Sequence, residues 1–196
     1  MHKTAATRNL LIGLVILSLG FGAFAQTEGE DKYRKAGNLV DESQFARALA
    51  IYQEILGAEP SPDPKTKSRV LNNMGFCHYK LQDLEKAAEF YRQAIDIDPD
   101  YVTCLNNLAA LLMNQVKYEE ALSCLNRAHG FEKNIKVVFN LFVCHYYLKH
   151  EKEARAFIEE AFALDDAYTS GRLKSKNISP KDLERLRKEI KSRHLS

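Results

Sequence analysis

Histidine and cysteine are the side chains in this 196-residue sequence best suited to metal binding, and they recur in one triplet. Cys77-His78-Tyr79 and Cys144-His145-Tyr146 lie 67 residues apart. A structural zinc site needs four such ligands that converge on one ion. We expect instead that His78 and His145 pack as aromatic core residues of a repeated element. The sequence therefore predicts no metal site and no cofactor.

Recognisable catalytic motifs are missing from the sequence. It contains no phosphate-binding glycine loop, no G-x-S-x-G turn and no H-E-x-x-H pattern. The acidic tract at 96–100 lacks the glutamate that closes a calcium-binding EF-hand loop, so we interpret it as a solvated turn. We expect no catalytic residue, no small-molecule substrate and no enzymatic activity.

The composition is that of a soluble globular chain, with 45% apolar and 28% charged residues. The 28 basic and 26 acidic residues give a formal net charge of +2, which is too balanced for a nucleic-acid binder. The length suits one domain and is too short for a catalytic domain plus a separate recognition domain. We expect no nucleic-acid partner.

Residues 1–25 have the three parts of a secretory signal peptide. Lys3 and Arg8 precede an uncharged apolar run, and the small-residue triplet Ala23-Phe24-Ala25 follows it. The stretch from 10 to 25 is shorter than the roughly 20 residues that cross a bilayer as a helix. We expect export with cleavage before Gln26, and an uncleaved membrane anchor is the alternative.

Small residues return along the chain with a period of 33 or 34 residues. Ala87, Ala121 and Ala154 form one series, and Gly75 and Ala109 belong to another. Helices that cross closely tolerate only small residues at the contact, so this period predicts one helix pair stacked repeatedly. A single pair cannot bury both of its faces, and about three or more repeats are needed for stability.

Residues 68–101 resemble a tetratricopeptide repeat (TPR). Gly75, Ala87, Tyr91, Ala94 and Pro99 stand at the spacing of the small, aromatic and closing proline positions of that motif. The resemblance implies an all-α TPR solenoid of about four helix-turn-helix repeats. We expect a TPR domain at 26–168, with repeats at about 29–62, 68–101, 102–134 and 135–168.

Three departures from the motif affect the expected boundaries. Five additional residues, Ser61-Pro62-Asp63-Pro64-Lys65, separate repeats one and two, and we expect this proline-rich stretch to be a non-helical connection. Phe142 stands where repeat four should have a small residue. Residues 169–196 form a basic tail, in which the apolar stripe of 183, 186 and 190 predicts a capping helix at 179–194.

The resemblance also implies a concave groove lined by the first helix of each repeat. Carried onto this sequence, the groove positions give a peptide-binding site rich in amide and aromatic groups. Its expected residues are Arg69, Asn72, Asn73, Phe76, Tyr79, Lys80, Asn106, Asn107, Asn114, Lys136, Asn140 and Tyr146.

Asn73, Asn107 and Asn140 fall at one position of three successive repeats. A carboxamide both donates and accepts hydrogen bonds, which suits the backbone of an extended peptide. The alternative is that these side chains bond a neighbouring helix. The positions of Tyr33 and Gly37 lack the residues with which some TPR proteins clamp a C-terminal carboxylate, so we do not expect that ligand class.

We interpret the chain as a non-catalytic adaptor that binds an extended peptide or partner segment, in the periplasm and within a cell-envelope assembly. The alternative is a structural subunit that uses its convex face or its basic C-terminal helix. From Arg172 onward nine basic residues stand against three acidic ones, so the tail carries +6. That charge leaves peripheral membrane association open.

Four cysteines are present, Cys77, Cys104, Cys124 and Cys144. In an oxidising compartment Cys124 and Cys144 could form a disulfide, because the repeat places them on neighbouring helices. The interpretation we favour is that all four are small buried apolar residues.

Overall fold

The computed structural model describes residues 28–175, 184–185 and 188, and every regular element in these ranges is an α-helix. The expected signal peptide at 1–25 and most of the expected capping helix at 179–194 lie outside the described residues. The chain divides into two compact halves, Met1–Asp98 and Pro99–Ser196, and each half is described by itself. None of the described helices is both long and apolar enough to cross a membrane.

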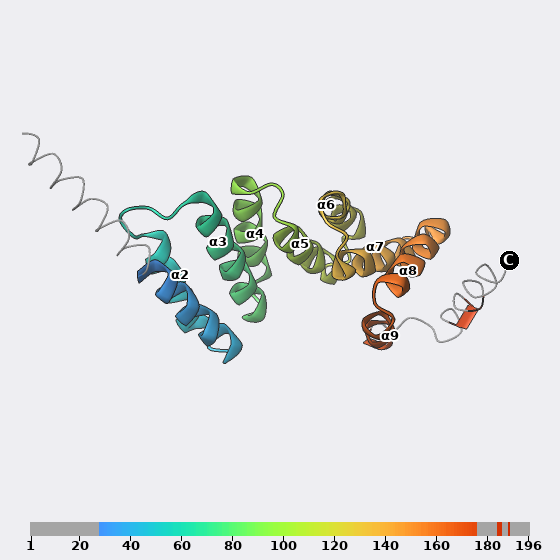
Figure 1. The fold of residues 1–196 in the computed structure, drawn as a ribbon, viewed down its shortest axis with the longest axis horizontal. Helices are drawn as coiled ribbons and strands as arrows, with labels where there is room; N and C mark the ends of the chain where they lie inside the picture. Colours follow the sequence, from blue (N-terminus) through green and yellow to red (C-terminus); the bar gives the residue numbers. More distant parts are fainter. Residues whose placement is uncertain (1–27, 176–183, 186–187, 189–196) are drawn as a thin grey trace, which may run out of the picture. The chain divides into compact units, whose positions relative to one another are not determined.

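The N-terminal half contains, within residues 28–98, a helix at 28–41 followed by α2 (Phe45–Leu56), α3 (Pro64–Lys80) and α4 (Leu84–Ile97) (Figure 1). α3 packs against α2 on one side and against α4 on the other. Repeats one and two share one buried cluster, which consists of Ala36, Ala48, Tyr52, Ile55, Val70, Met74 and Cys77. Residues 28–56 and 64–97 thus each form a helix pair.

The proline-rich connection is shorter than expected, because α3 already begins at Pro64. Asp63 is the N-cap: its Oδ1 accepts a hydrogen bond from the Thr66 backbone N–H at 3.0 Å, and its Oδ2 accepts one from the Thr66 hydroxyl at 2.6 Å. Proline is well tolerated at the first helical position, where its missing N–H has no intrahelical partner anyway. The prediction that Ser61–Lys65 is entirely non-helical was wrong for its last two residues.

Close helix crossing explains the glycine of the repeat motif. A Cβ on Gly75 of α3 would lie 2.7 Å from Cδ1 and 2.8 Å from Cε1 of Tyr91 on α4. Tyr91 is itself buried. Only glycine lets α3 approach α4 closely enough for this ring to fill the space between them.

The C-terminal half contains, within residues 99–175, two further helix pairs and one more helix. The first pair is α5 (Val102–Asn114) and α6 (Tyr118–Phe131), and the second is α7 (Ile135–Tyr147) and α8 (Glu151–Leu164). α6 packs against both α5 and α7, and α7 packs against α8. Phe142 is fully buried on α7 although the repeat motif has a small residue there.

α9 (Asp166–Ser175) was not expected from the sequence, which predicted a basic tail from 169 with its helix only at 179–194. Thr169 anchors it: the buried hydroxyl donates to the carbonyls of Ala161 at 2.9 Å and Asp165 at 2.7 Å. Leu173 is buried as well. α9 packs against α8, so part of the apolar face that repeat four would leave open is covered by α9.

All four helix pairs turn through one residue in the left-handed region. Ser43, Gln82, Val116 and Lys149 have φ values of 60°, 65°, 63° and 63°. In each turn the next residue donates its backbone N–H to the carbonyl five residues earlier, at 2.7 to 2.9 Å. Such bonds satisfy carbonyls that the end of a helix leaves unpaired. The same turn geometry thus links every pair.

Candidate functional site

The groove residues expected in repeat two all lie on α3. Arg69 and Lys80 are exposed, and Asn73, Phe76 and Tyr79 are half-buried. Asn72 is only 4% exposed, so little of it remains for a ligand. The Lys80 ammonium lies over the Phe76 ring, 5.4 Å from its centre.

Asn73 of α3 forms hydrogen bonds to the helix at 28–41 and to α2. Its Nδ2 donates to the hydroxyl of Tyr33 at 2.9 Å and to that of Tyr52 at 3.1 Å. Asn72 Nδ2 donates to Asn73 Oδ1 at 3.2 Å. Burial raises the pKa of Tyr52 to about 12, so its hydroxyl stays neutral. The side chain of Asn73 therefore bonds neighbouring helices, as in the alternative weighed for the repeated asparagines.

Arg69 is held in place by an aromatic ring. Its guanidinium carbon lies 4.5 Å from the centre of the Tyr33 ring, within cation–π range. Arg69 forms no ion pair with any other described residue, so its N–H donors remain available beside Tyr33.

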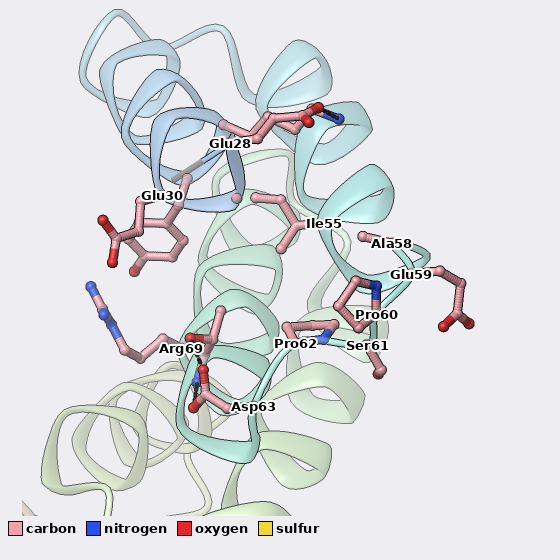
Figure 2. Close-up of a pocket in the computed structure, with 14 residues that line it drawn as sticks. Glu28, Glu30, Ile55, Ala58, Glu59, Pro60, Ser61, Pro62, Asp63 and Arg69 are labelled. Carbon is pink, nitrogen blue, oxygen red and sulfur yellow. Dashed lines mark hydrogen bonds and ion pairs between the residues drawn. The ribbon is translucent and has the colours of Figure 1, made fainter. Parts of the chain in front are cut away.

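A cavity of about 640 Å³ opens next to Arg69. We call it the Arg69 cavity; its apolar lining includes Ile55, Pro60, Pro62 and the ring of Tyr33. Figure 2 shows Ile55, Pro60, Pro62 and Arg69 around the same space. The connection that lengthens the spacing between repeats one and two therefore supplies one wall of the cavity. The repeat spacing indicated that this connection is long, but it did not predict the space that the connection lines.

The Arg69 cavity is lined by both acidic and basic side chains. Lys32 forms ion pairs with Glu28 at 3.2 Å and with Glu54 at 3.5 Å. Glu30 and Glu59 also contribute to the lining. Of the two cations in the lining, Lys32 is paired with carboxylates, whereas Arg69 forms no ion pair with a described residue.

The expected groove residues of the C-terminal half are arranged differently. Asn140 is 6% exposed and its Nδ2 donates to Asn106 Oδ1 at 2.9 Å, which joins α7 to α5. Asn107 is half-buried, and Asn114 and Lys136 are exposed. Asn140 is thus largely withdrawn from solvent, like Asn72.

Aromatic side chains dominate the rest of α7. Tyr147 stacks on Tyr118 of α6 with 5.0 Å between ring centres, and its edge meets Tyr146 at 5.4 Å. Phe139 is fully buried, because Tyr168 and Arg172 of α9 pack against its ring. α9 therefore covers part of α7.

The two histidines of the recurring triplet pack on aromatic rings, but both are half-buried rather than part of the core that we expected. His78 stacks on Phe90 at 5.2 Å and 17°, and His145 stacks on Phe157 at 5.5 Å and 13°. Each ring also meets a side chain five residues later, Asp83 and His150 respectively. Sequence reasoning missed these two partners, although the recurring spacing of 78 with 83 and of 145 with 150 was there to find.

The cysteines, all within residues 28–175, are thiols in the structure. Cys77, Cys104 and Cys144 are buried and Cys124 is half-buried. Burial raises the pKa of Cys77 to about 11. In the described part of the chain, no three His, Cys, Asp or Glu side chains gather as metal ligands.

Comparison with curated proteins finds relatives with assembly functions in their names. Photosystem I assembly protein Ycf3 of Rippkaea orientalis is 37% identical over 79 residues, which is 40% of this chain and 44% of the relative. The protein of the same name from Acaryochloris marina is 33% identical over 101 residues, or 51% of this chain and 60% of the relative. The matches thus span about half the length of these relatives.

Family models and solved structures agree on the fold. The tetratricopeptide repeat model matches residues 68–101, and a second tetratricopeptide repeat model matches residues 102–129. The structure titled as the functional characterisation of pilF from Pseudomonas aeruginosa aligns with a TM-score of 0.64 at 13% identity, over 76% of this chain and 67% of that one. These repeats and the all-α fold identify the chain as a tetratricopeptide repeat protein.

Proposed function

We propose that this TPR protein is a non-catalytic adaptor that holds an extended segment of a partner protein during the assembly of a complex. The Arg69 cavity carries this proposal. Its volume of about 640 Å³ lies in the range of roughly 300–1,000 Å³ typical of ligand sites. Its walls combine apolar side chains with several charged ones, so an occupant needs both apolar contact and polar partners.

The lining of the cavity favours one kind of occupant. Ile55, Pro60 and Pro62 offer apolar contact to a single side chain of the partner, while Arg69 can donate to a carbonyl or carboxylate beside it. Because Tyr33 already holds the guanidinium, little side-chain entropy is lost when Arg69 binds. A segment with an apolar residue next to an acceptor group fits both features.

Two further observations support the adaptor role. The relatives are named as assembly proteins, and TPR proteins bind protein or peptide partners. The signal-peptide pattern at 1–25 supports export and a role in a cell-envelope assembly. We therefore propose that the protein is exported and that the complex it helps to assemble belongs to the cell envelope.

Affinity capture from a native extract tests the proposal with three forms of the full-length protein. Arg69→Ala should lose most of the partner that the wild type recovers. Arg92→Ala, which removes an exposed arginine from α4, should recover the partner in full. Equal recovery by all three proteins, at unchanged melting temperature, would refute a role of the cavity.

A further inference from the structure

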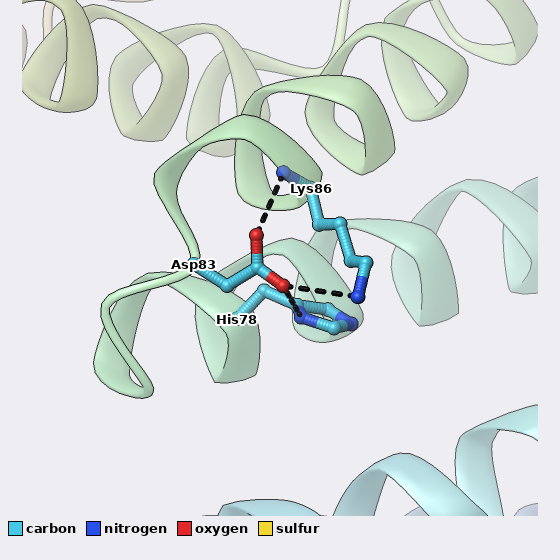
Figure 3. Close-up of polar contacts among 3 residues, drawn as sticks. All are labelled: His78, Asp83 and Lys86. Carbon is cyan, nitrogen blue, oxygen red and sulfur yellow. Dashed lines mark hydrogen bonds and ion pairs between the residues drawn. The ribbon is translucent and has the colours of Figure 1, made fainter.

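In repeats two and four, the histidine of the recurring triplet contacts the side chain five residues later. That side chain is a carboxylate in repeat two and an imidazole in repeat four. Positions 78, 83 and 86 correspond to 145, 150 and 153, each 67 residues later. In repeat two, His78 Nδ1 lies 3.4 Å from Asp83 Oδ2, and Lys86 Nζ lies 3.1 Å from the same oxygen (Figure 3). A protonated His78 therefore faces a carboxylate.

In repeat four the carboxylate is replaced by a second imidazole. His145 Nδ1 lies 3.2 Å from His150 Nδ1. Two imidazole nitrogens form a hydrogen bond when one carries a proton and the other presents its lone pair. If both are protonated, two N–H groups point at each other and the contact becomes repulsive. The pair therefore tolerates one proton between the facing nitrogens, and not two.

Neighbouring elements hold the pair in this geometry. The His145 ring is stacked on Phe157 of α8. His150 is the N-cap of α8, where the helix dipole disfavours a positive charge. Its backbone N–H donates to the His145 carbonyl at 2.9 Å, so the turn itself fixes the distance between the two residues.

The other ionisable groups around His145 come from α8 and α6. Glu153 of α8 favours the protonated form of His145, and it is a weaker influence than burial or His150. On α6, His129 meets the Phe157 ring in a T-shaped contact, with 5.7 Å between ring centres. Glu160 Oε2 lies 4.0 Å from His129 Nε2 and is the carboxylate that pairs with that ring.

We infer that His145 and His150 form a proton-sensitive latch between α7 and α8, which closes when the facing nitrogens share one proton and opens when both imidazoles are protonated. The corresponding contact in repeat two responds in the opposite direction, because protonated His78 and Asp83 attract. Acid therefore loosens one helix pair of the C-terminal half and leaves the matching contact of the N-terminal half closed.

Burial lowers the pKa of His145, and His150 lowers it further. These two effects set the direction of the pH dependence. The neutral form is thus favoured in the folded protein. Stability from the latch is complete above the unfolded histidine pKa of about 6.5. It is lost as the pH falls below that value, until the folded pKa is passed.

NMR titration of the histidine side chains in the wild-type protein provides the first test, with EDTA present to keep metal ions out of the pair. The expected result is that His145 titrates below the ordinary histidine pKa of about 6.5. Amide hydrogen exchange of α8, corrected for the intrinsic exchange rate, measures how often this helix opens. Its opening constant should rise in acid about tenfold for each unit by which the pKa of His145 lies below 6.5.

His150→Asp installs in repeat four the acid that repeat two already has. It should move the His145 titration to higher pH and abolish the acid-induced opening of α8. His129→Gln is the matched control, because it removes the other imidazole beside Phe157 and should leave the titration of His145 low. A wild-type His145 that titrates at or above about 6.5, or an α8 whose exchange does not change with pH, overturns the latch.

Discussion

At the scale of single residues, the two side chains that meet where the helices of a repeat cross differ in size from repeat to repeat. Gly75 faces Tyr91 sixteen residues later. At the corresponding positions, repeat three has Ala109 with Leu125, and repeat four has Phe142 with an isoleucine at 158. All these positions are buried. The ring of Tyr91 is thus matched with the smallest residue, whereas Ala109 and Phe142 are matched with aliphatic side chains.

Gly75→Ala should destabilise the protein by about 1–3 kcal/mol, the usual cost of overpacking a core. The added methyl group would lie 2.7 Å from the Tyr91 ring and 3.1 Å from the Ala87 carbonyl oxygen. Urea denaturation followed by circular dichroism measures the change.

Two further variants separate overpacking from a general effect of replacing glycine in a helix. Gly130→Ala adds a methyl group on α6 where no atom lies within 4 Å, and it should stabilise by about 0.5–1 kcal/mol. The double variant Gly75→Ala, Tyr91→Leu copies the pair of repeat three and should regain part of the loss. A Gly75→Ala protein as stable as wild type would contradict the size argument.

Val116→Asn should stabilise the protein by about 1 kcal/mol. Val116 has a φ of 63°, a region that disfavours β-branched residues, and its side chain is 69% exposed, so little packing is lost. Asparagine adopts this conformation more readily. Thermal unfolding compares the variant with wild type, and Gln82→Asn, at an unbranched residue in the corresponding turn, should give a smaller gain. A larger gain at Gln82 would show that backbone strain is not the cause.

At the scale of helices, the repeat pattern predicted most of the fold and less of the site. The helix pairs at 68–101 and 102–134 follow from the spacing of small residues, because crossing geometry restricts those positions directly. α9 was missed because its polar sequence has a single buried leucine, Leu173, and depends on Thr169 for its anchor. The partners of Asn73 could not be predicted, since Tyr33 and Tyr52 reach it from different helices.

Asn73→Ala should destabilise the N-terminal half by about 1–3 kcal/mol, because it leaves the buried hydroxyl of Tyr52 without its amide partner. Urea denaturation measures the loss. Tyr33→Phe removes only the more exposed partner and should cost less. If Asn73→Ala is as stable as wild type but loses the captured partner, the asparagine acts on the ligand and not on the fold.

At the scale of the whole molecule, charge separates the adaptor from its alternative. After loss of residues 1–25, the chain has 26 basic and 26 acidic residues, and the tail from Arg172 carries +6 while the remainder carries −6. A basic segment gains roughly 1 kcal/mol per Lys or Arg near an anionic membrane, and salt screens the attraction over about 8 Å at physiological ionic strength. The tail can therefore attract such a surface without any contribution from the Arg69 cavity.

Neutralising the tail should separate these two properties in one protein. Replacing Lys181, Arg187, Lys191 and Arg193 by Gln lowers the tail charge from +6 to +2 in a full-length chain. We expect weaker sedimentation with anionic vesicles at low salt and undiminished capture of the protein partner, because the cavity lies in repeats one and two. Arg69→Ala should show the reverse pattern. If the neutral tail loses the partner and Arg69→Ala keeps it, the protein is a structural subunit held through its tail, and the adaptor proposal fails.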